Sequence, residues 1–196
     1  MSRSIDLLKK RYLENIKEKP DLFLGIELEY PVINLEGKAT DSEVVKDLFR
    51  YLPSVLGFTI EKVDDFGNPI QLLDPVSQDT ILFEVSYTTI EFAFGRAESI
   101  QEVEVRFRDY MILIQNKLGE ANHAIVGSGI HPNWNKNENQ PVAYARYQML
   151  MNYLKLGRTV LGANLHDYPQ YGAFICGSQV QLDVSKSNYL RVINAF

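Results

Sequence analysis

The chain has 196 residues, 45% of them hydrophobic, which is long enough to bury one sizeable core, so a single domain is expected. The formal net charge of -5, from 25 acidic and 20 basic residues, argues against nucleic acid as the main partner, since phosphate neutralisation needs clustered Lys and Arg. The only cysteine, Cys176, excludes an internal disulfide and a multi-thiolate metal site, which leaves carboxylates and three histidines as candidate metal ligands.

The first predicted elements are a helix and a strand. Apolar residues recur every three to four positions over 4–19, which predicts an amphipathic helix ending before Pro20. Charged residues interrupt this segment, so it does not have the pattern of a signal peptide, and no other stretch approaches membrane-spanning length. We therefore expect a cytoplasmic protein that makes no membrane contact. A partly β-branched apolar run predicts a strand over 22–33, followed by a turn.

The next hundred residues are predicted to alternate between helices and short strands. Asp41 or Ser42 caps a helix that runs through Leu52 and is ended by Pro53 and Gly57. A hairpin is predicted over 58–73, and a β-rich stretch over 80–94 is expected to form two strands with a bend between them. Further elements are predicted as a helix over 99–119 that opens with the capping box Ser99 and Glu102, and a buried strand over 124–130.

The last part of the chain is predicted to contain a polar loop, two helices and a strand. These elements are the loop 132–140, a helix over 141–154, a strand over 174–184 and a helix that begins near Ser187. Leu190, Ile193 and Phe196 would give that last helix an apolar side with no C-cap after it. We therefore expect 1–196 to form one catalytic-type domain truncated at its C-terminus, with self-association through an unpaired sheet edge or this apolar side.

Two glutamates, Glu27 and Glu29, lie two residues apart in the first predicted strand. Side chains at this spacing project from the same face of a strand, so two like charges share one side. Such a pair repels unless water screens it or a cation lies between the carboxylates. The spacing therefore leaves two interpretations open, a solvated sheet face and a metal site.

A second pair, Glu84 and Glu91, has apolar neighbours on both sides. Burying such carboxylates without partners is costly. Positions seven apart in one straight strand point to opposite faces, so a shared site requires a bend, bulge or tight hairpin between them.

These residues resemble a known family, the glutamate-cysteine ligases of the glutamine synthetase-like superfamily. The motifs that carry the resemblance occur in the family order and run from about Gly25 to the end of the chain. They are Gly25-Ile-Glu-Leu-Glu29, the pair Glu84 and Glu91, Gly127-Ser-Gly-Ile-His-Pro-Asn-Trp134, Arg146-Tyr147 with its helix, and Gln179-Val-Gln-Leu-Asp-Val-Ser185. Any one of them occurs often by chance, whereas five in order form a specific pattern.

The resemblance implies an α+β fold with a mainly antiparallel sheet and helices packed on one face. It also implies ligation of the glutamate side chain to the amine of cysteine, or of another acceptor, through an acyl phosphate made from ATP. Glu27, Glu29, Glu84 and Glu91 would then hold Mg²⁺ or Mn²⁺, because hard cations prefer carboxylate oxygens. The expected partners are small molecules: ATP, glutamate and an amine. Such ligases run to roughly twice this length, which supports the expectation of a truncated domain.

Four further residues are candidates at this site. Arg146 has a planar fork that suits an anionic substrate or phosphate, or a surface salt bridge on its helix. Gln179 and Gln181 face one side of their strand, where they would bind nucleotide or metal through oxygen, or lie at the edge of the core. Trp134 would stack on adenine or fill its loop.

The family pattern is not matched everywhere. Between Glu84 and Glu91, where the family often has a Pro-Gly-Gly turn, this chain has no glycine. Phe174-Ile175 and Met151 occupy places where plant-like members carry Arg-Thr and an arginine. A substrate carboxylate is therefore expected to be held differently here.

Other residues and other functions remain as alternatives. His131, after a glycine-rich strand end, is a weaker candidate ligand, whereas His123 and His166 are expected at the surface or at caps and Cys176 in the core. A glycoside hydrolase also uses paired carboxylates and predicts no magnesium dependence. A non-catalytic nucleotide-binding fragment predicts binding without phosphate release.

Overall fold

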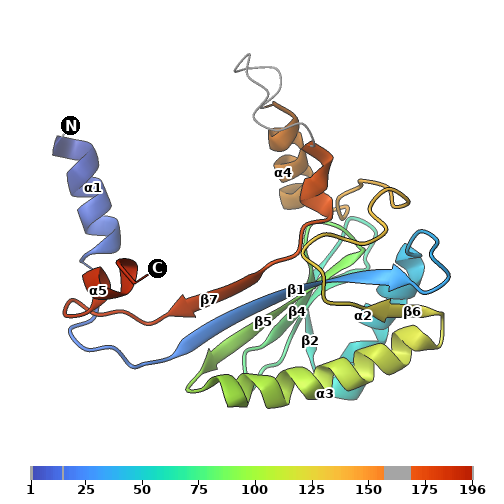
Figure 1. The fold of residues 1–196 in the computed structure, drawn as a ribbon, viewed down its shortest axis with the longest axis horizontal. Helices are drawn as coiled ribbons and strands as arrows, with labels where there is room; N and C mark the ends of the chain where they lie inside the picture. Colours follow the sequence, from blue (N-terminus) through green and yellow to red (C-terminus); the bar gives the residue numbers. More distant parts are fainter. Residues whose placement is uncertain (1, 15, 157–168, 196) are drawn as a thin grey trace.

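A seven-stranded antiparallel sheet forms the centre of the structure, a computed structural model that describes residues 2–14, 16–156 and 169–195. The strand order is β2-β3-β4-β5-β1-β6, and β7 pairs with β1 beside the short β6 (Figure 1). The strands are β1 Leu24–Asn34, β2 Thr59–Val63, β3 Pro69–Leu73, β4 Thr80–Phe83, β5 Thr89–Ala97, β6 His123–Ile125 and β7 Ser178–Leu182. The predicted α+β class with a mainly antiparallel sheet is confirmed.

Two long helices, α2 and α3, cover one face of this sheet (Figure 1). The helices are α1 Ser2–Tyr12, α2 Ser42–Leu56, α3 Ile100–Gly119, α4 Ala145–Leu156 and α5 Tyr189–Ile193, with a 3₁₀ helix at Pro169–Ala173. Asp41 caps α2 by accepting the Glu43 N–H, and Ser99 caps α3 by accepting the Glu102 N–H. Both caps match the predicted helix starts. Helix α4 lies on the other side of the sheet, at its rim.

Alternation along β1 and β5 separates the core from the opposite face. Ile26, Leu28 and Tyr30 pair with Phe94, Phe92 and Ile90, and these side chains pack in or against the hydrophobic core. Residues of the opposite parity include Glu29 and Glu91, which are direct cross-strand partners. The same alternation that buries one face therefore gathers carboxylates on the other.

The bend between Glu84 and Glu91 is a tight turn that joins β4 to β5. Val85, with φ of 58°, adopts the left-handed conformation, which is uncommon for residues other than glycine. The Glu84 N–H donates to the carbonyl of Thr89, and the Val142 N–H donates to the carbonyl of Val85, so the turn is held from both sides. The predicted bend is thus confirmed without a glycine.

Several predicted element bounds were wrong. Helix α1 ends at Tyr12, although 4–19 was predicted as helix, and β6 is three residues long because the chain leaves the sheet after Ile125. Helix α4 begins at Ala145 instead of Pro141, because the backbone of Val142 is used to hold the β4–β5 turn. Helix α2 continues through Pro53 to Leu56, although it was predicted to run only through Leu52, and Gly57, whose φ is 72°, caps its end.

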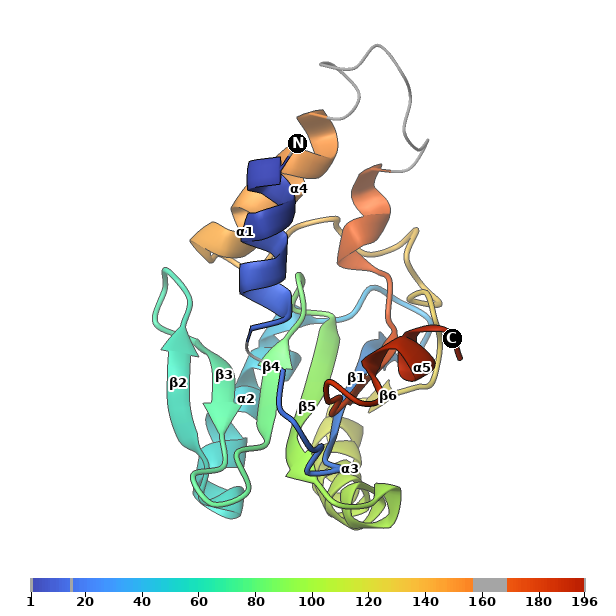
Figure 2. The same cartoon turned by 90° about the vertical axis from the view of Figure 1, so that its left-hand side faces the viewer.

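Helices α1 and α5 both lie beyond the end of β7 that is away from α2 and α3 (Figure 1). Figure 2 shows that the two helices are separated from each other. Lys17 and Ser185 form an isolated bridge there, and Lys186 donates to Glu18. The side chains of Leu190 and Ile193 are exposed, at 61% and 66%. Self-association through this region, and the extent of the domain, remain predictions; Phe196 and His166 lie outside the described residues. In the described ranges, no helix has the length and apolar character needed to cross a membrane.

Candidate functional site

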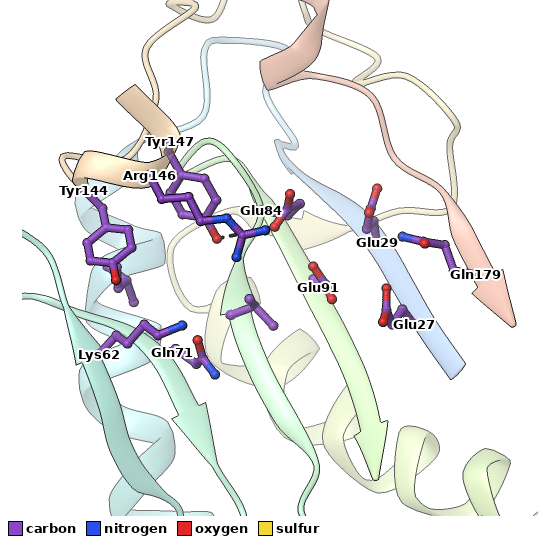
Figure 3. Close-up of a pocket in the computed structure, with 12 residues that line it drawn as sticks. Glu27, Glu29, Lys62, Gln71, Glu84, Glu91, Tyr144, Arg146, Tyr147 and Gln179 are labelled. Atoms are coloured by element: carbon purple, nitrogen blue, oxygen red, sulfur yellow. Dashed lines mark hydrogen bonds between the residues drawn. The ribbon is translucent and has the colours of Figure 1, made fainter. Parts of the chain in front are cut away.

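All four predicted glutamates line one pocket on the sheet face opposite α2 and α3 (Figure 3). The pocket encloses about 750 Å³, part of it open to solvent, between the sheet and the start of α4. Its lining consists of Glu27, Glu29, Lys62, Ile70, Gln71, Leu82, Glu84, Glu91, Tyr144, Arg146, Tyr147 and Gln179. Carboxylates from β1, β5 and the end of β4 are therefore gathered in one place.

Each glutamate of β1 is fixed by a donor from the β7 side. The Gln181 Nε2 donates to Glu27 Oε1 at 2.9 Å, and the Gly177 N–H donates to Glu29 Oε2 at 2.7 Å. Burial, together with the charges of Glu84 and Glu27, raises the pKa of Glu29, although the Gly177 hydrogen bond opposes this change. One donor for each carboxylate leaves further oxygen lone pairs free to bind a ligand in the pocket.

Glu91 is the most perturbed of the four carboxylates. It is 9% exposed and lies opposite Glu29 across the β1–β5 ladder. Burial, followed by the nearby charge of Glu84, raises the pKa of Glu91 from 4.5 to about 8. Without a cation, Glu91 is therefore mostly protonated at neutral pH and shares its hydrogen bond with Glu84.

The chemistry of this donor set fits a hard divalent cation such as Mg²⁺. Like charges placed directly across a ladder destabilise a sheet, and a cation between them would remove that cost. Within the described ranges, no three His, Cys, Asp or Glu side chains are placed to hold one ion together. Mg²⁺ fits this arrangement, because it is usually bound by one or two carboxylates and completes its shell with water and substrate phosphates.

Two positive side chains also line the pocket. Arg146, in the first turn of α4, points into the pocket near Glu84, and Lys62 of β2 reaches in from the far edge (Figure 3). Neither side chain forms an ion pair with another described residue. The described residues therefore give no support to the alternative that Arg146 makes a surface salt bridge. The Tyr147 hydroxyl donates to the Phe83 carbonyl at 2.7 Å and to Glu84 Oε2 at 3.3 Å, which fixes the helix that carries Arg146.

The other predicted binding residues differ in their places. Gln179 lines the pocket as the cross-strand partner of Glu27, and Gln181 contacts Glu27 from the same side of β7. Trp134 is 49% exposed in its loop and is not part of the pocket lining. The positions of Gln179 and Gln181 at the pocket thus support their predicted binding roles. The position of Trp134 does not support the predicted stacking on adenine.

His131 is a structural residue in this fold. It is fully buried, and its Nε2 donates to the Val32 carbonyl at 2.9 Å while its Nδ1 accepts the Asn133 N–H at 3.1 Å. Burial lowers the pKa of His131, so the neutral ring is favoured. Both ring nitrogens are occupied, which leaves none for a ligand.

The other weak candidates, His123 and Cys176, do not line the glutamate pocket, and Cys176 is partly buried and lies outside the hydrophobic core in which it was predicted. His123 is buried, so the predicted surface position was wrong, but its Nε2 accepts the Asp41 N–H at the start of α2, as expected of a capping residue. Burial raises the pKa of Cys176 to about 12, so this thiol is not ionised at neutral pH.

Sequence reasoning missed Lys62, Gln71 and Tyr144 as pocket residues. Gln71 had a detectable signal, because it is a polar residue within the apolar strand Pro69–Leu73. Lys62 had none, since exposed lysines are common in edge strands.

Comparison with known families gives one match that covers most of the chain. The model of the family described as GCS2, glutamate-cysteine ligase family 2, matches residues 23–194. No curated protein matches the sequence. The matched range contains every residue of the pocket described above.

Proposed function

The chain belongs to glutamate-cysteine ligase family 2, and on this premise we propose that it joins the side-chain carboxylate of glutamate to the amine of cysteine in an ATP-dependent reaction. Members of this family are ATP-dependent carboxylate-amine ligases that use a divalent metal, and their fold is glutamine synthetase-like. The reaction would be the first step of glutathione synthesis. The choice of glutamate and cysteine is the part of the proposal that goes beyond family membership.

The observation that carries the proposal is the gathering of Glu27, Glu29, Glu84 and Glu91 in one pocket. Two of them are cross-strand neighbours, and Glu91 has a pKa raised to about 8. Burying carboxylates close together costs free energy, and a cation bound between them offsets this cost, so such clusters are typical of functional sites. Mg²⁺ bound here would neutralise the charge of the triphosphate and of the phosphoryl group in transfer.

The proposed chemistry has two steps. A carboxylate oxygen of glutamate attacks the γ-phosphorus of ATP, the bond to the β–γ bridging oxygen breaks, and ADP leaves with an acyl phosphate formed on glutamate. The cysteine amine then attacks the acyl carbon, phosphate leaves, and the amine loses a proton as the amide forms. No protein nucleophile is required, so positioning and electrostatics carry the rate.

In this scheme the residues of the chain divide the work by charge. The four glutamates would hold Mg²⁺ ions, with one or two carboxylates for each ion. Arg146 would bind phosphate or a substrate carboxylate through its fork, and Gln179 and Gln181 would position the carboxylates or the nucleotide. Tyr147 holds Glu84 and the start of α4 in place. We assign no general base.

The test is phosphate release from ATP by the purified chain with magnesium, glutamate and cysteine, with the product identified by mass. Release that needs both amino acids and yields the dipeptide would support the proposal. Release with a different amine in place of cysteine would identify a related carboxylate-amine ligase. Binding of Mg-ATP with no release under any of these conditions would contradict catalysis by this chain and favour a nucleotide-binding role.

A further inference from the structure

Lys62 faces the glutamate cluster from the opposite end of the same pocket (Figure 3). It lies in β2, a strand at one edge of the sheet, and its side chain lines the pocket together with Gln71 of the neighbouring strand. None of the motifs recognised in the sequence includes it. Lys62 is exposed, like the rest of β2, so its ammonium group is accessible to a ligand in the pocket.

The strand register places Lys62 in one row with the glutamates. Lys62 pairs with Gln71, Gln71 with Leu82, and Leu82 with Glu91. Glu91 in turn pairs with Glu29, which extends the row to β1. Residues that are directly opposite across a ladder share a face, so the row runs across five strands with a cation at one end and carboxylates at the other.

An irregularity in β2 puts the lysine, and not its neighbour, in this row. Ile60 pairs with Leu72, so regular pairing would place Glu61 opposite Gln71. The register shifts between Ile60 and Lys62, and Lys62 takes that place. A β-bulge of this kind redirects side chains, and bulges are common next to active sites. Here the bulge places the positive Lys62, instead of the negative Glu61, opposite Gln71 in the row.

The second cation, Arg146, lies in the first turn of α4, and contacts on both sides of it attach this turn to the sheet. Val142 and Tyr147 fasten the segment that leads into α4 to the β4–β5 turn. Arg146 therefore projects into the pocket between the two ends of the row (Figure 3). In the described part of the chain, no carboxylate lies within ion-pairing distance of either cation, so both are available to a ligand.

We propose that Lys62 is a further substrate-binding residue that holds an anionic oxygen group of the substrates at the end of the pocket opposite the glutamates, while Arg146 contacts the same ligand between the two ends of the row. This inference rests on the proposed function. Lys62 and Glu91 are three strand spacings apart, about 14 Å between their backbones. A ligand that reaches both ends must be elongated and must carry anionic groups. A nucleoside triphosphate meets both conditions, and so does a nucleotide with an amino-acid substrate bound next to it. An ammonium group with three rotatable donors suits either a phosphate or a carboxylate.

The test compares the wild-type chain with variants that change the charge in the row. Lys62→Gln removes the charge, Lys62→Arg keeps it, and Glu61→Lys with Lys62→Glu exchanges the two charges without altering the net charge. Lys38→Gln, in an exposed loop, is the matched control. Affinities are measured by calorimetry for three probes: Mg-ADP, magnesium with inorganic tripolyphosphate, and glutamate. Melting temperatures without ligand verify that each variant is folded.

Lys62→Gln and the exchanged pair are expected to lose about tenfold in affinity for at least one anionic probe, whereas Lys62→Arg and Lys38→Gln stay near wild type. Loss confined to tripolyphosphate and Mg-ADP identifies the group as a phosphate, and loss confined to glutamate identifies it as a carboxylate. If the wild type binds the probes and Lys62→Gln binds them with the same affinity, this inference is overturned, but the proposed function is not. A wild type that binds none of the probes would overturn the proposed function with it.

Discussion

At the scale of single residues, the site is defined by carboxylates whose charges oppose one another. Glu29 and Glu91 face each other across the ladder, and Glu84 shares a hydrogen bond with Glu91. Sequence spacing alone favoured a solvated sheet face over a metal site. The structure adds burial and a shared pocket, which a solvated face does not explain.

The raised pKa of Glu91 predicts a stability that depends on pH. Because the folded chain holds this proton up to about pH 8 and the unfolded chain releases it near 4.5, the folded state binds more protons between these values. Without metal, the contribution of Glu91 to stability is therefore present at pH 4.5 and is lost as the pH rises to 8.

This prediction is checked by melting temperatures of the metal-free chain and of Glu91→Gln between pH 5 and 9. The variant is expected to melt close to wild type at pH 5 and at a higher temperature than wild type at pH 9. Glu104→Gln, in an exposed ion pair on α3, serves as the control and should follow the wild-type curve. Parallel curves for Glu91→Gln and wild type would show that Glu91 ionises normally.

Glu27→Gln and Glu29→Gln are predicted to separate folding from metal binding. Both substitutions keep the side-chain shape and an acceptor oxygen, and they remove one of the repelling charges. We expect the metal-free stability to be equal or higher, and the affinity for Mg²⁺ or Mn²⁺ to fall by roughly tenfold or more. The measurements are melting temperature and Mn²⁺ titration. Equal metal affinity in wild type and both variants would mean that this pair is only a solvated face.

At the scale of elements, the pocket depends on how α4 is attached to the end of β4. Tyr147 is 7% exposed, and its hydroxyl is the contact to the Phe83 carbonyl and to Glu84. Tyr147→Phe would leave that buried carbonyl with one partner fewer, at a cost of about 1–2 kcal/mol in the free energy of unfolding.

The same substitution should also weaken nucleotide binding, because Arg146 and Glu84 lose a shared support. Tyr153→Phe, on the exposed side of the same helix at 69% exposure, is the matched control. Denaturant unfolding and Mg-ADP titration measure the two effects. A Tyr147→Phe chain as stable as Tyr153→Phe would contradict the proposed attachment of α4.

How well each element could be predicted depended on whether its signal was local. The alternation of β1 and the caps at Asp41 and Ser99 are local, and they were predicted correctly. The bend at Val85 was inferred only from the need to bring Glu84 and Glu91 together, because a valine in a left-handed conformation has no sequence signal.

The part of the site that was missed depends on pairing between strands. The place of Lys62 follows from a register shift between β2 and β3, which a single sequence does not reveal. The start of α4 was misplaced for a similar reason, since Val142 is held by a contact to Val85 far away in the sequence. Both the place of Lys62 and the start of α4 are therefore set by contacts between residues that are far apart in the sequence.

At the scale of the whole molecule, one face of the sheet forms the hydrophobic core and the other face carries the candidate site. Helices α2 and α3 bury one face, and the other face carries the carboxylates, with α4 and the edge strand β2 closing the pocket around them (Figures 1 and 3). A metal-nucleotide complex bound there would join both walls of the pocket, the negative and the positive. Such a ligand binds only the folded chain, so it should stabilise the fold by mass action.

The central claim is that the four glutamates bind magnesium together with a nucleotide, and a thermal-shift titration with Mg-ATP tests it most directly. We predict that the melting temperature of the wild-type chain rises with Mg-ATP concentration, by an amount that corresponds to about 2.7 kcal/mol at a hundred times the dissociation constant. ATP without magnesium should give a smaller rise, and Glu29→Gln a smaller rise with Mg-ATP. A flat wild-type titration up to millimolar Mg-ATP would contradict the account.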